Sequence, residues 1–506
     1  MRTRRERVPG LRAPQATERD GVWRVAVPSA LIAAFGFGGV AAGDLVDGDD
    51  IQEAIDAASA GDVIAIPAGV FPVDTPIDLR GKEITLRGAV GKGGLPATIL
   101  DGGDSSRVMQ CVSGESSQTR IQNLAIVNGQ ATEGAGLRIV ASSPRVEGCL
   151  FEANVSETAG CFPCPPGQGS TPADGGAVWI DQGLPGFVDC VFQGNVAAEG
   201  AAIWARDAAL VVRNCTFQDH VAGGGAIWAD SSVLDLDDVE FLNNRNLVGD
   251  PVFSGGAIRL ENGSLDLKGG LFVLNEARFG GALYFANLDD QPTQLRIEDV
   301  RFESNAAVDA GGAVTVEYVG AGTVPVELVD IGCHLNASGG NGGGFNFTGG
   351  GFLDLSFEGC NITDNFAENL GGGVFIKNLS TEPVAYVDCR IKANAAPRGS
   401  GIFDTRCPAF DGVVVCGNEI EPQIDAGDGC TVPESGGCLV TECCEGDLDC
   451  NGVVDGADLA RLLGDWGLCN GCIGDLAGAG DDQKVANGRV DGQDLTIILG
   501  GWGLCD

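Results

Sequence analysis

The sequence predicts an all-β fold, a right-handed single-stranded parallel β-helix solenoid, followed by a small α-helical domain at the C-terminus. The main observation is a two-part repeat in the middle of the chain. Its first part is Gly-Gly-Ala, or a close variant, followed by an apolar and often aromatic residue. Steps of 24 to 31 residues, with one step of 41, are typical of stacked coils that cannot bury an apolar face alone. This part begins at Gly134, Gly175, Gly200, Gly224, Gly255, Gly280, Gly311, Gly342, Gly371 and Gly399.

The second part of the repeat is an apolar residue followed three positions later by Asn. Asn at one turn is expected to stack from coil to coil and exchange amide hydrogen bonds. We expect His220 and Ser338 to replace Asn in two units. We interpret His220 as a turn residue rather than a general base, because no nucleophile pattern accompanies it. The Asn residues are Asn154, Asn195, Asn244, Asn275, Asn305, Asn365 and Asn394.

Two segments are predicted before the solenoid. Residues 1–42 are basic at first, then apolar from 25 to 40, and end with small residues, as in a signal peptide for export. An uncleaved membrane anchor is the alternative. Residues 43–61 are expected to form a capping helix, because Ile51, Ala54, Ile55 and Ala58 have helical spacing after two Asp residues. This helix would cover the first coil of the β-helix, which is expected at 62–405.

Composition limits the classes of partner. The 506 residues include 80 Gly and only 2 His, and the formal net charge is -39. This charge argues against nucleic acid and anionic membranes as main partners, because no basic tract is present to neutralise phosphates. It favours divalent cations instead. The chain has only two histidines, so it has few residues that could serve in a Ser-His-Asp triad or as ligands of a catalytic zinc ion.

The cysteines form two groups. One group stands two residues before the apolar anchor of the repeat, where other units have Val or Gly, which indicates a buried small apolar position. More than half of the 19 cysteines lie beyond residue 400, where we expect disulfides in an exported protein. Residues 406–445 are interpreted as a Cys, Gly and Pro-rich linker. The first group comprises Cys149, Cys190, Cys215, Cys360 and Cys389.

Gly-Gly-Ala-Ile paired with Phe-x-x-Asn resembles the repeat of polymorphic outer-membrane proteins. The segment from Ile51 to Gly88 resembles the first coils of pectate-lyase-like right-handed β-helices. Together these resemblances cover about residues 45–405, and they imply the fold more than the function.

A calcium loop is predicted at residues 447–458. Oxygen ligands occupy positions 1, 3, 5, 9 and 12, a carbonyl is available at position 7, and Gly452 at position 6 permits the sharp turn. Asp stands at position 12, where Glu is usual. The proposed Ca²⁺ ligands are Asp447, Asp449, Asn451, Val453, Asp455 and Asp458.

The block from 453 to 470 recurs 36 residues later. Two loop–helix units of this kind at 446–506 resemble a type I dockerin, and this resemblance implies calcium binding and a cohesin-like protein partner. Two features depart from that family: an eight-residue insertion interrupts the second loop, and Gly456, Ala457, Gly492 and Gln493 replace the Ser or Thr that often reads the partner. The second set of calcium ligands is Asp475, Asn487, Arg489, Asp491 and Asp494.

An aromatic column is predicted on the outside of the β-helix. Side chains alternate across a strand, so the residue after each inward apolar residue of the Gly-Gly-Ala segment should point outward. Trp179, Trp204 and Trp228 would then stack about 4.8 Å apart as an exposed stripe suited to sugar rings. Arg259 and Tyr284 follow them in the same column as further substrate-binding candidates.

Two residues further along each strand, a second outward column carries charged residues. Neighbouring carboxylates there have spacings used by glycosidases, and an arginine could hold an acidic sugar or act as a lyase base. The alternative is a solvated ladder of salt bridges, with the Trp stripe covered by the long turn around Cys161 and Cys164. The catalytic candidates are Asp181, Asp230, Glu261 and Arg206.

Two functions remain open. The first is an exported, noncatalytic β-helix that binds a polysaccharide or cell-surface glycan, or acts as an adhesion scaffold, with a calcium-ordered tail for attachment. The second is a polysaccharide-degrading lyase or glycoside hydrolase. The first is favoured, since fold resemblance alone does not establish catalysis.

Overall fold

The computed structural model describes residues 50–157, 173–246, 254–289, 292–320, 322–377, 383–406, 408–418, 423–426 and 439–440, and, in the C-terminal part, 453–454, 456–464, 466–468, 489–490, 492–500 and 502–504. The predicted signal peptide lies outside these residues.

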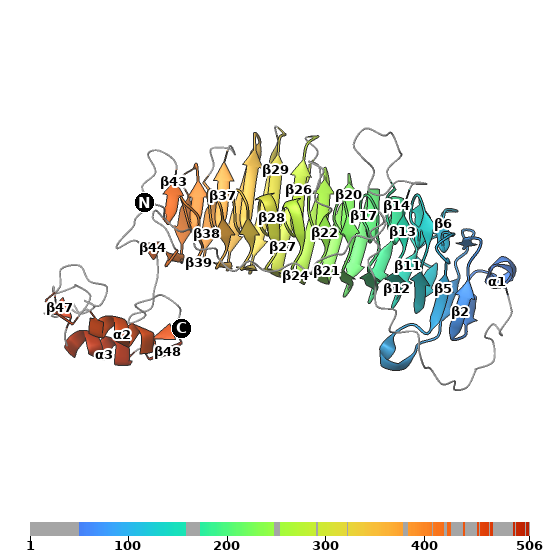
Figure 1. The fold of residues 1–506 in the computed structure, drawn as a ribbon, viewed down its shortest axis with the longest axis horizontal. Coiled ribbons are helices and arrows are strands. Elements are labelled where there is room, and N and C mark those ends of the chain that lie inside the picture. Colours follow the sequence, from blue (N-terminus) through green and yellow to red (C-terminus); the bar gives the residue numbers. More distant parts are fainter. Residues whose placement is uncertain are drawn as a thin grey trace, which may run out of the picture. The chain divides into compact units, whose positions relative to one another are not determined.

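The described residues between 63 and 426 form a parallel β-solenoid, as predicted (Figure 1). Each repeat places strands on up to three faces, which we name in chain order after the Gly-Gly-Ala segment. The first face begins with that segment, the second carries the longest strands, and the third holds short strands after the Asn turn. Strand β17 (Ile203–Arg213) runs through both the first and the second face.

The remaining first-face strands are β3 (Ile77–Asp78), β6 (Met109–Cys111), β10 (Leu137–Val140), β14 (Val178–Gly183), β20 (Ile227–Asp230), β23 (Ile258–Glu261), β26 (Leu283–Asn287), β29 (Val314–Tyr318), β33 (Phe345–Gly349), β37 (Val374–Lys377), β40 (Ile402–Asp404) and β43 (Ile424–Ala426). The third face comprises β9 (Gln130–Ala131), β13 (Val155–Ser156), β19 (Val221–Ala222), β22 (Arg245–Asn246), β25 (Glu276–Phe279), β28 (Ala306–Ala310), β32 (Ala337–Ser338) and β36 (Phe366–Ala367).

The second face comprises β1 (Val63–Ile66), β2 (Gly69–Pro72), β4 (Thr85–Gly88), β5 (Thr98–Asp101), β7 (Arg120–Gln122), β8 (Leu124–Val127), β11 (Arg145–Glu147), β12 (Leu150–Glu152), β15 (Gly186–Val188), β16 (Val191–Gln193), β18 (Thr216–Gln218), β21 (Val233–Leu242), β24 (Ser264–Val273), β27 (Leu295–Glu303), β30 (Thr323–Val329), β31 (Gly332–His334), β34 (Phe352–Glu358), β35 (Asn361–Thr363), β38 (Ala385–Val387), β39 (Arg390–Lys392), β41 (Ala409–Asp411) and β42 (Val414–Cys416). Strand β44 (Leu439–Val440) pairs with β42 in the antiparallel sense.

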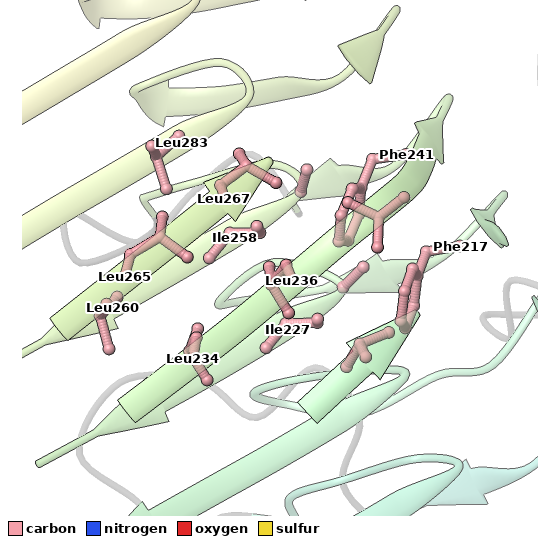
Figure 2. Close-up of a cluster of buried hydrophobic side chains, with 14 of the residues drawn as sticks. Phe217, Ile227, Leu234, Leu236, Phe241, Ile258, Leu260, Leu265, Leu267 and Leu283 are labelled. Carbon is pink, nitrogen blue, oxygen red and sulfur yellow. The ribbon is translucent and has the colours of Figure 1, made fainter. Parts of the chain in front are cut away.

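The core lies between the faces. In β21 the side chains of Leu234, Leu236, Val239 and Phe241 are fully buried. The other residues of the strand are half-buried or exposed, so buried and outward residues alternate except at the corner residues Asp237 and Asp238. Figure 2 shows the labelled buried side chains of β21 in one interior cluster with Ile227 and Ile258 of the first face. Each fully buried side chain of this size contributes about 1.5–3 kcal/mol.

The corners are left-handed backbone positions. Gly255 has a φ of 67°, and a Cβ there would lie 2.0 Å from the Ile258 carbonyl oxygen, so no other residue fits. Another corner, within the second face, holds Asn, Asp or Gly in successive units, among them Asn214 and Asp238 with φ of 50° and 51°. Asn and Asp tolerate this conformation better than other L-residues, which explains the composition of these turns.

The predicted Asn ladder is present at the turn before the third face. From Asn244 to Asn418, each side-chain Nδ2 donates to the Oδ1 of the next Asn at 2.9–3.1 Å. The expectation for Ser338 was wrong, because Asn336 occupies the ladder and Ser338 lies on the third face. Cys333 stands where other units have Phe or Ile. Without that large apolar residue as a marker, the predicted ladder position in this unit was two residues too far along the chain. His220 does replace Asn, and its Nδ1 accepts from the Asn195 N–H at 3.1 Å.

The predicted capping helix is α1 (Ile51–Ala57). Asp50 caps its N-terminus by accepting from two backbone N–H groups. Ile51 and Ile55 join the solenoid core. At the other end, the Lys82 ammonium donates to three carbonyl oxygens of the last turn at 2.8 Å, where a cation complements the helix dipole.

The cysteines of the repeat are buried free thiols, as expected for a small apolar position. Burial raises the pKa of the Cys149 thiol to about 12, which makes it a poor nucleophile. Cys416, beyond residue 400, is disulfide-bonded.

The C-terminal part contains two equivalent units. Strand β45 (Val453–Val454), helix α2 (Gly456–Gly464) and strand β46 (Gly467–Leu468) recur as β47 (Arg489–Val490), α3 (Gly492–Gly500) and β48 (Gly503–Leu504). β45 pairs with β48 and β46 with β47, so each unit completes the strands of the other. Val454, Leu462, Val490 and Ile498 form the buried core. None of the described helices is both long and apolar enough to span a bilayer.

Candidate functional site

The predicted aromatic column exists on the first face. Trp179, Trp204 and Trp228 are in register on β14, β17 and β20. Their ring centroids are 5.1 and 5.2 Å apart, with interplanar angles of 1° and 12°. Arg206 also lies over the Trp204 ring at 5.4 Å, a cation–π contact.

The expectation that this stripe is exposed was wrong. The three side chains are only 6%, 6% and 9% exposed. The rings cover one another's faces, and the glycine corner lies against them, since a Cβ at Gly224 would lie 2.8 Å from Cδ1 of Trp228. Each outward indole therefore packs on a turn, and alternation alone does not make it solvent-exposed. A sugar ring cannot lie flat on rings that are already stacked on one another.

The other two residues of the predicted binding column are also buried. Arg259 is 7% exposed and donates to Glu261 at 2.8 Å. Tyr284 is 8% exposed, and its hydroxyl donates to Glu317 at 2.8 Å. Both side chains are held in place by carboxylates of the second outward column.

The second outward column also has the predicted register, with Asp181, Arg206, Asp230 and Glu261 on consecutive strands. Its carboxylates are engaged by neighbours. Arg206 makes a two-pronged contact with Asp181 at 3.1 and 3.2 Å, and this contact raises the pKa of the guanidinium. Asp230 accepts from Asn262 at 3.1 Å, and Glu261 pairs with Arg259. These contacts match the salt-bridge alternative.

Sequence reasoning missed a third column at the opposite edge of the indoles. Glu133, Asp174 and Glu199 are in register on consecutive coils. Each directly precedes the first Gly of its unit, and this shared position was the signal that could have revealed them. Burial, and then the charges of Glu199 and Glu133, raise the pKa of Asp174 to about 8. Burial also raises the pKa of Glu199, while Arg259 and the Trp204 indole oppose this shift.

The indoles point their nitrogen edge toward the turn that carries this third column. The Cβ position at Gly224 lies 3.6 Å from the Trp228 Nε1, and Gly224 directly follows the residue that stands in the third column. The Trp228 Nε1 is buried and makes no hydrogen bond to any described residue. The Trp204 indole likewise reaches the carboxylate of Glu199 in this column.

Most of the predicted calcium ligands lie outside the described residues. These are Asp447, Asp449, Asn451, Asp455, Asp475, Asn487 and Asp491. Val453 lies in β45 and Arg489 in β47, while Asp458 and Asp494 lie at equivalent positions of α2 and α3. The Asp458 side chain is fully buried.

The C-terminal units present large apolar side chains to solvent at equivalent positions. Leu463 and Trp466 are 53% and 48% exposed, and Leu499 and Trp502 are 56% and 52% exposed. Among the described residues of this module, four large apolar side chains are exposed and four apolar side chains are completely buried. Exposed apolar residues of this size mark interaction surfaces when they occur together.

No family model matches the chain, and no curated protein matches it. The catalytic domain of a GH87 α-1,3-glucanase, solved in complex with tetrasaccharides, is similar at 12% identity and a TM-score of 0.32, over 76% of this chain and 68% of that one. PfbA, a surface adhesin of Streptococcus pneumoniae, is similar at 12% identity and a TM-score of 0.31, over 78% and 93%. At such low identity and TM-score, neither similarity assigns a function to this chain.

Proposed function

We propose that this protein is an exported, noncatalytic adhesion scaffold, in which a β-solenoid is attached to a partner protein by a calcium-stabilised C-terminal module. The observation that carries this proposal is the pair of exposed Leu–Trp sets on equivalent units, Leu463 with Trp466 and Leu499 with Trp502. Aromatic residues at exposed positions are frequent anchors of protein interfaces. The resemblance to dockerins names the partner as a cohesin-like protein.

The contacts on the first face favour a scaffold over an enzyme. Asp181, Asp230 and Glu261 are each held by an arginine or an asparagine, so the proposed catalytic carboxylates form part of a ladder of polar contacts. Stacked Phe and Trp columns and the Asn ladder connect successive coils along the solenoid. Such a continuous array suits a rigid spacer that holds a binding site away from its point of attachment.

The test is partner binding by the full mature chain. Replacing Trp466 and Trp502 together by Ala should weaken binding to a cohesin-like module at least tenfold. Truncating an aromatic hot-spot residue in an interface costs about 2 kcal/mol or more of binding free energy. The matched control is Phe352→Ala, which removes an equally exposed aromatic side chain from the solenoid, where Phe352 is 47% exposed. Equal affinity of the double variant and the control would contradict attachment through this surface.

A further inference from the structure

The corner before the first face places three carboxylates on consecutive coils. Glu133 pairs in register with Asp174, and Asp174 with Glu199. Strands in register lie about 4.8 Å apart. Like charges carried on adjacent coils disfavour ionisation of all three groups at once. The middle residue, Asp174, experiences both neighbours.

Asp174 is also the most enclosed member of this column. It is 9% exposed, and its Oδ1 is buried with no hydrogen-bond partner among the described residues. An ionised carboxylate in that position would lose its hydration without gaining a compensating donor. The neutral acid carries a proton and therefore removes both the desolvation penalty and the repulsion.

The cations at this corner compensate the two ends of the column rather than its middle. Arg138 pairs with Glu133 at 3.3 Å, and Arg107 donates to the Glu133 carbonyl oxygen. Arg259 attracts the Glu199 carboxylate from the far side, where Glu261 and Asp230 repel it. Residues 158–172, which precede Asp174 in the chain, contain no Asp, Glu, Lys, Arg or His.

The corner is mechanically connected to the tryptophan stack. Gly175 follows Asp174, and a Cβ at Gly175 would lie 2.9 Å from both Cα and Cβ of Trp179. On the next coil, the Trp204 indole stabilises the charged form of Glu199. A displacement of the carboxylate column therefore moves the backbone on which the indoles pack.

We propose that Asp174 is a proton-binding switch: it holds the corner closed while protonated, and its ionisation separates Glu133, Asp174 and Glu199 and exposes the indoles of Trp179, Trp204 and Trp228. One proton leaves to solvent in this step, and no bond other than the carboxyl O–H breaks. The pKa of about 8 given above places the transition in mildly alkaline solution. The device goes beyond the scaffold function, because it makes the surface of the first face depend on pH.

The experiment is a pH titration of the full mature chain from pH 6 to 10, followed by tryptophan fluorescence. We expect one transition near pH 8 with emission shifting to longer wavelength as the indoles meet water, while far-UV circular dichroism stays constant. Trp466 and Trp502 are already half exposed and form a constant background. Absence of any transition in this range would overturn the proposal.

Two kinds of variant assign the transition to this corner. Asp174→Asn should abolish it, whereas Asp181→Asn, a matched change on the other side of the indoles, should leave it in place. Glu133→Gln removes one like charge and should move the midpoint to lower pH, and this outcome decides the matter if Asp174→Asn does not fold. A transition that persists unchanged in Asp174→Asn, or a midpoint that Glu133→Gln does not lower, would refute the switch.

Discussion

His220 shows how one residue changes the chemistry of a continuous ladder. The ladder positions around it hold Asn, whose amide both donates and accepts, whereas the His220 Nδ1 accepts and its buried Nε2 has no partner in the described structure. Burial lowers the pKa of His220 to about 3, against weaker opposing effects of its backbone contacts. The ring is therefore neutral in the folded protein at any pH above about 3, while the unfolded chain takes up a proton near pH 6.5.

The difference between the folded and unfolded pKa of His220 predicts that the free energy of unfolding depends on pH. The unfolded state binds more protons than the folded state between pH 6.5 and about 3, so stability falls as the pH falls through that window. His220→Asn should restore the amide chain, adding about 1 kcal/mol at pH 7.5. At pH 5 its advantage should grow by about 2 kcal/mol, at about 1.4 kcal/mol per pH unit.

Urea unfolding at the two pH values measures this. His334→Asn is the control, since the His334 side chain is 46% exposed and lies outside the ladder. An advantage of His220→Asn that is the same at pH 5 and pH 7.5 would show that the buried imidazole does not set the acid sensitivity.

At the scale of the element, the second face is held by a column of stacked phenylalanines. Phe192, Phe217, Phe241 and Phe272 have ring centroids 4.6 to 4.8 Å apart, close to the spacing of the strands that carry them. Each ring therefore buries both faces on identical neighbours. The element gains its stability from contacts between coils, which a single coil cannot make.

Truncating a ring in this column should be costly. Phe241→Ala removes a fully buried side chain that contacts rings on both sides, and we expect a loss of about 3–5 kcal/mol in unfolding free energy. Phe352→Ala, at an exposed site of the same face, should change it by about 0.5 kcal/mol or less. Chemical denaturation compares the two variants, and similar losses in both would argue against the stack as the source of stability.

For the helices of the C-terminal module, we predict stabilisation by Ca²⁺ that depends on Asp458. If Asp458 ligates Ca²⁺ from the start of α2, Ca²⁺ at about 100 times its Kd should stabilise the module by about 2.7 kcal/mol, and Asp458→Asn should abolish that gain. Asp494→Asn is the matched change in α3, beside the loop with the eight-residue insertion, and should have the smaller effect. Calorimetric titration of the full chain with Ca²⁺ separates them. Unaltered Ca²⁺ affinity in Asp458→Asn would remove this residue from the site.

At the scale of the whole molecule, the fold could be predicted from the sequence because every coil repeats the same pattern of corners and strands. The Gly-Gly-Ala and Asn positions mark corners, and the alternation between them gives the register, so the members of both outward columns were predicted correctly. Their exposure was not. Whether an outward indole meets water also depends on how the preceding corner packs against it, as Gly224 does against Trp228.

The Asp174 column was missed for a related reason. Its three members precede glycines separated by steps of 41 and 25 residues, so nothing local relates them until the coils are stacked. Turn residues have no alternating pattern from which burial can be inferred. The repeat pattern also led to the wrong prediction that Ser338 belongs to the ladder. In that unit Cys333 replaces the large apolar residue that precedes the ladder Asn by three positions in other units.

The Asn ladder has a direction, and the chain itself completes both of its ends. At the beginning, the Asn154 Oδ1 accepts from the Gly129 N–H, and at the end the Asn418 Nδ2 donates to the Gln423 side chain. Among the described residues, neither end of the ladder therefore leaves an Asn side-chain amide without a partner. Open stacks of parallel strands template fibre growth through such free groups. The side-chain ladder therefore contributes no free amide through which a second solenoid could extend the stack.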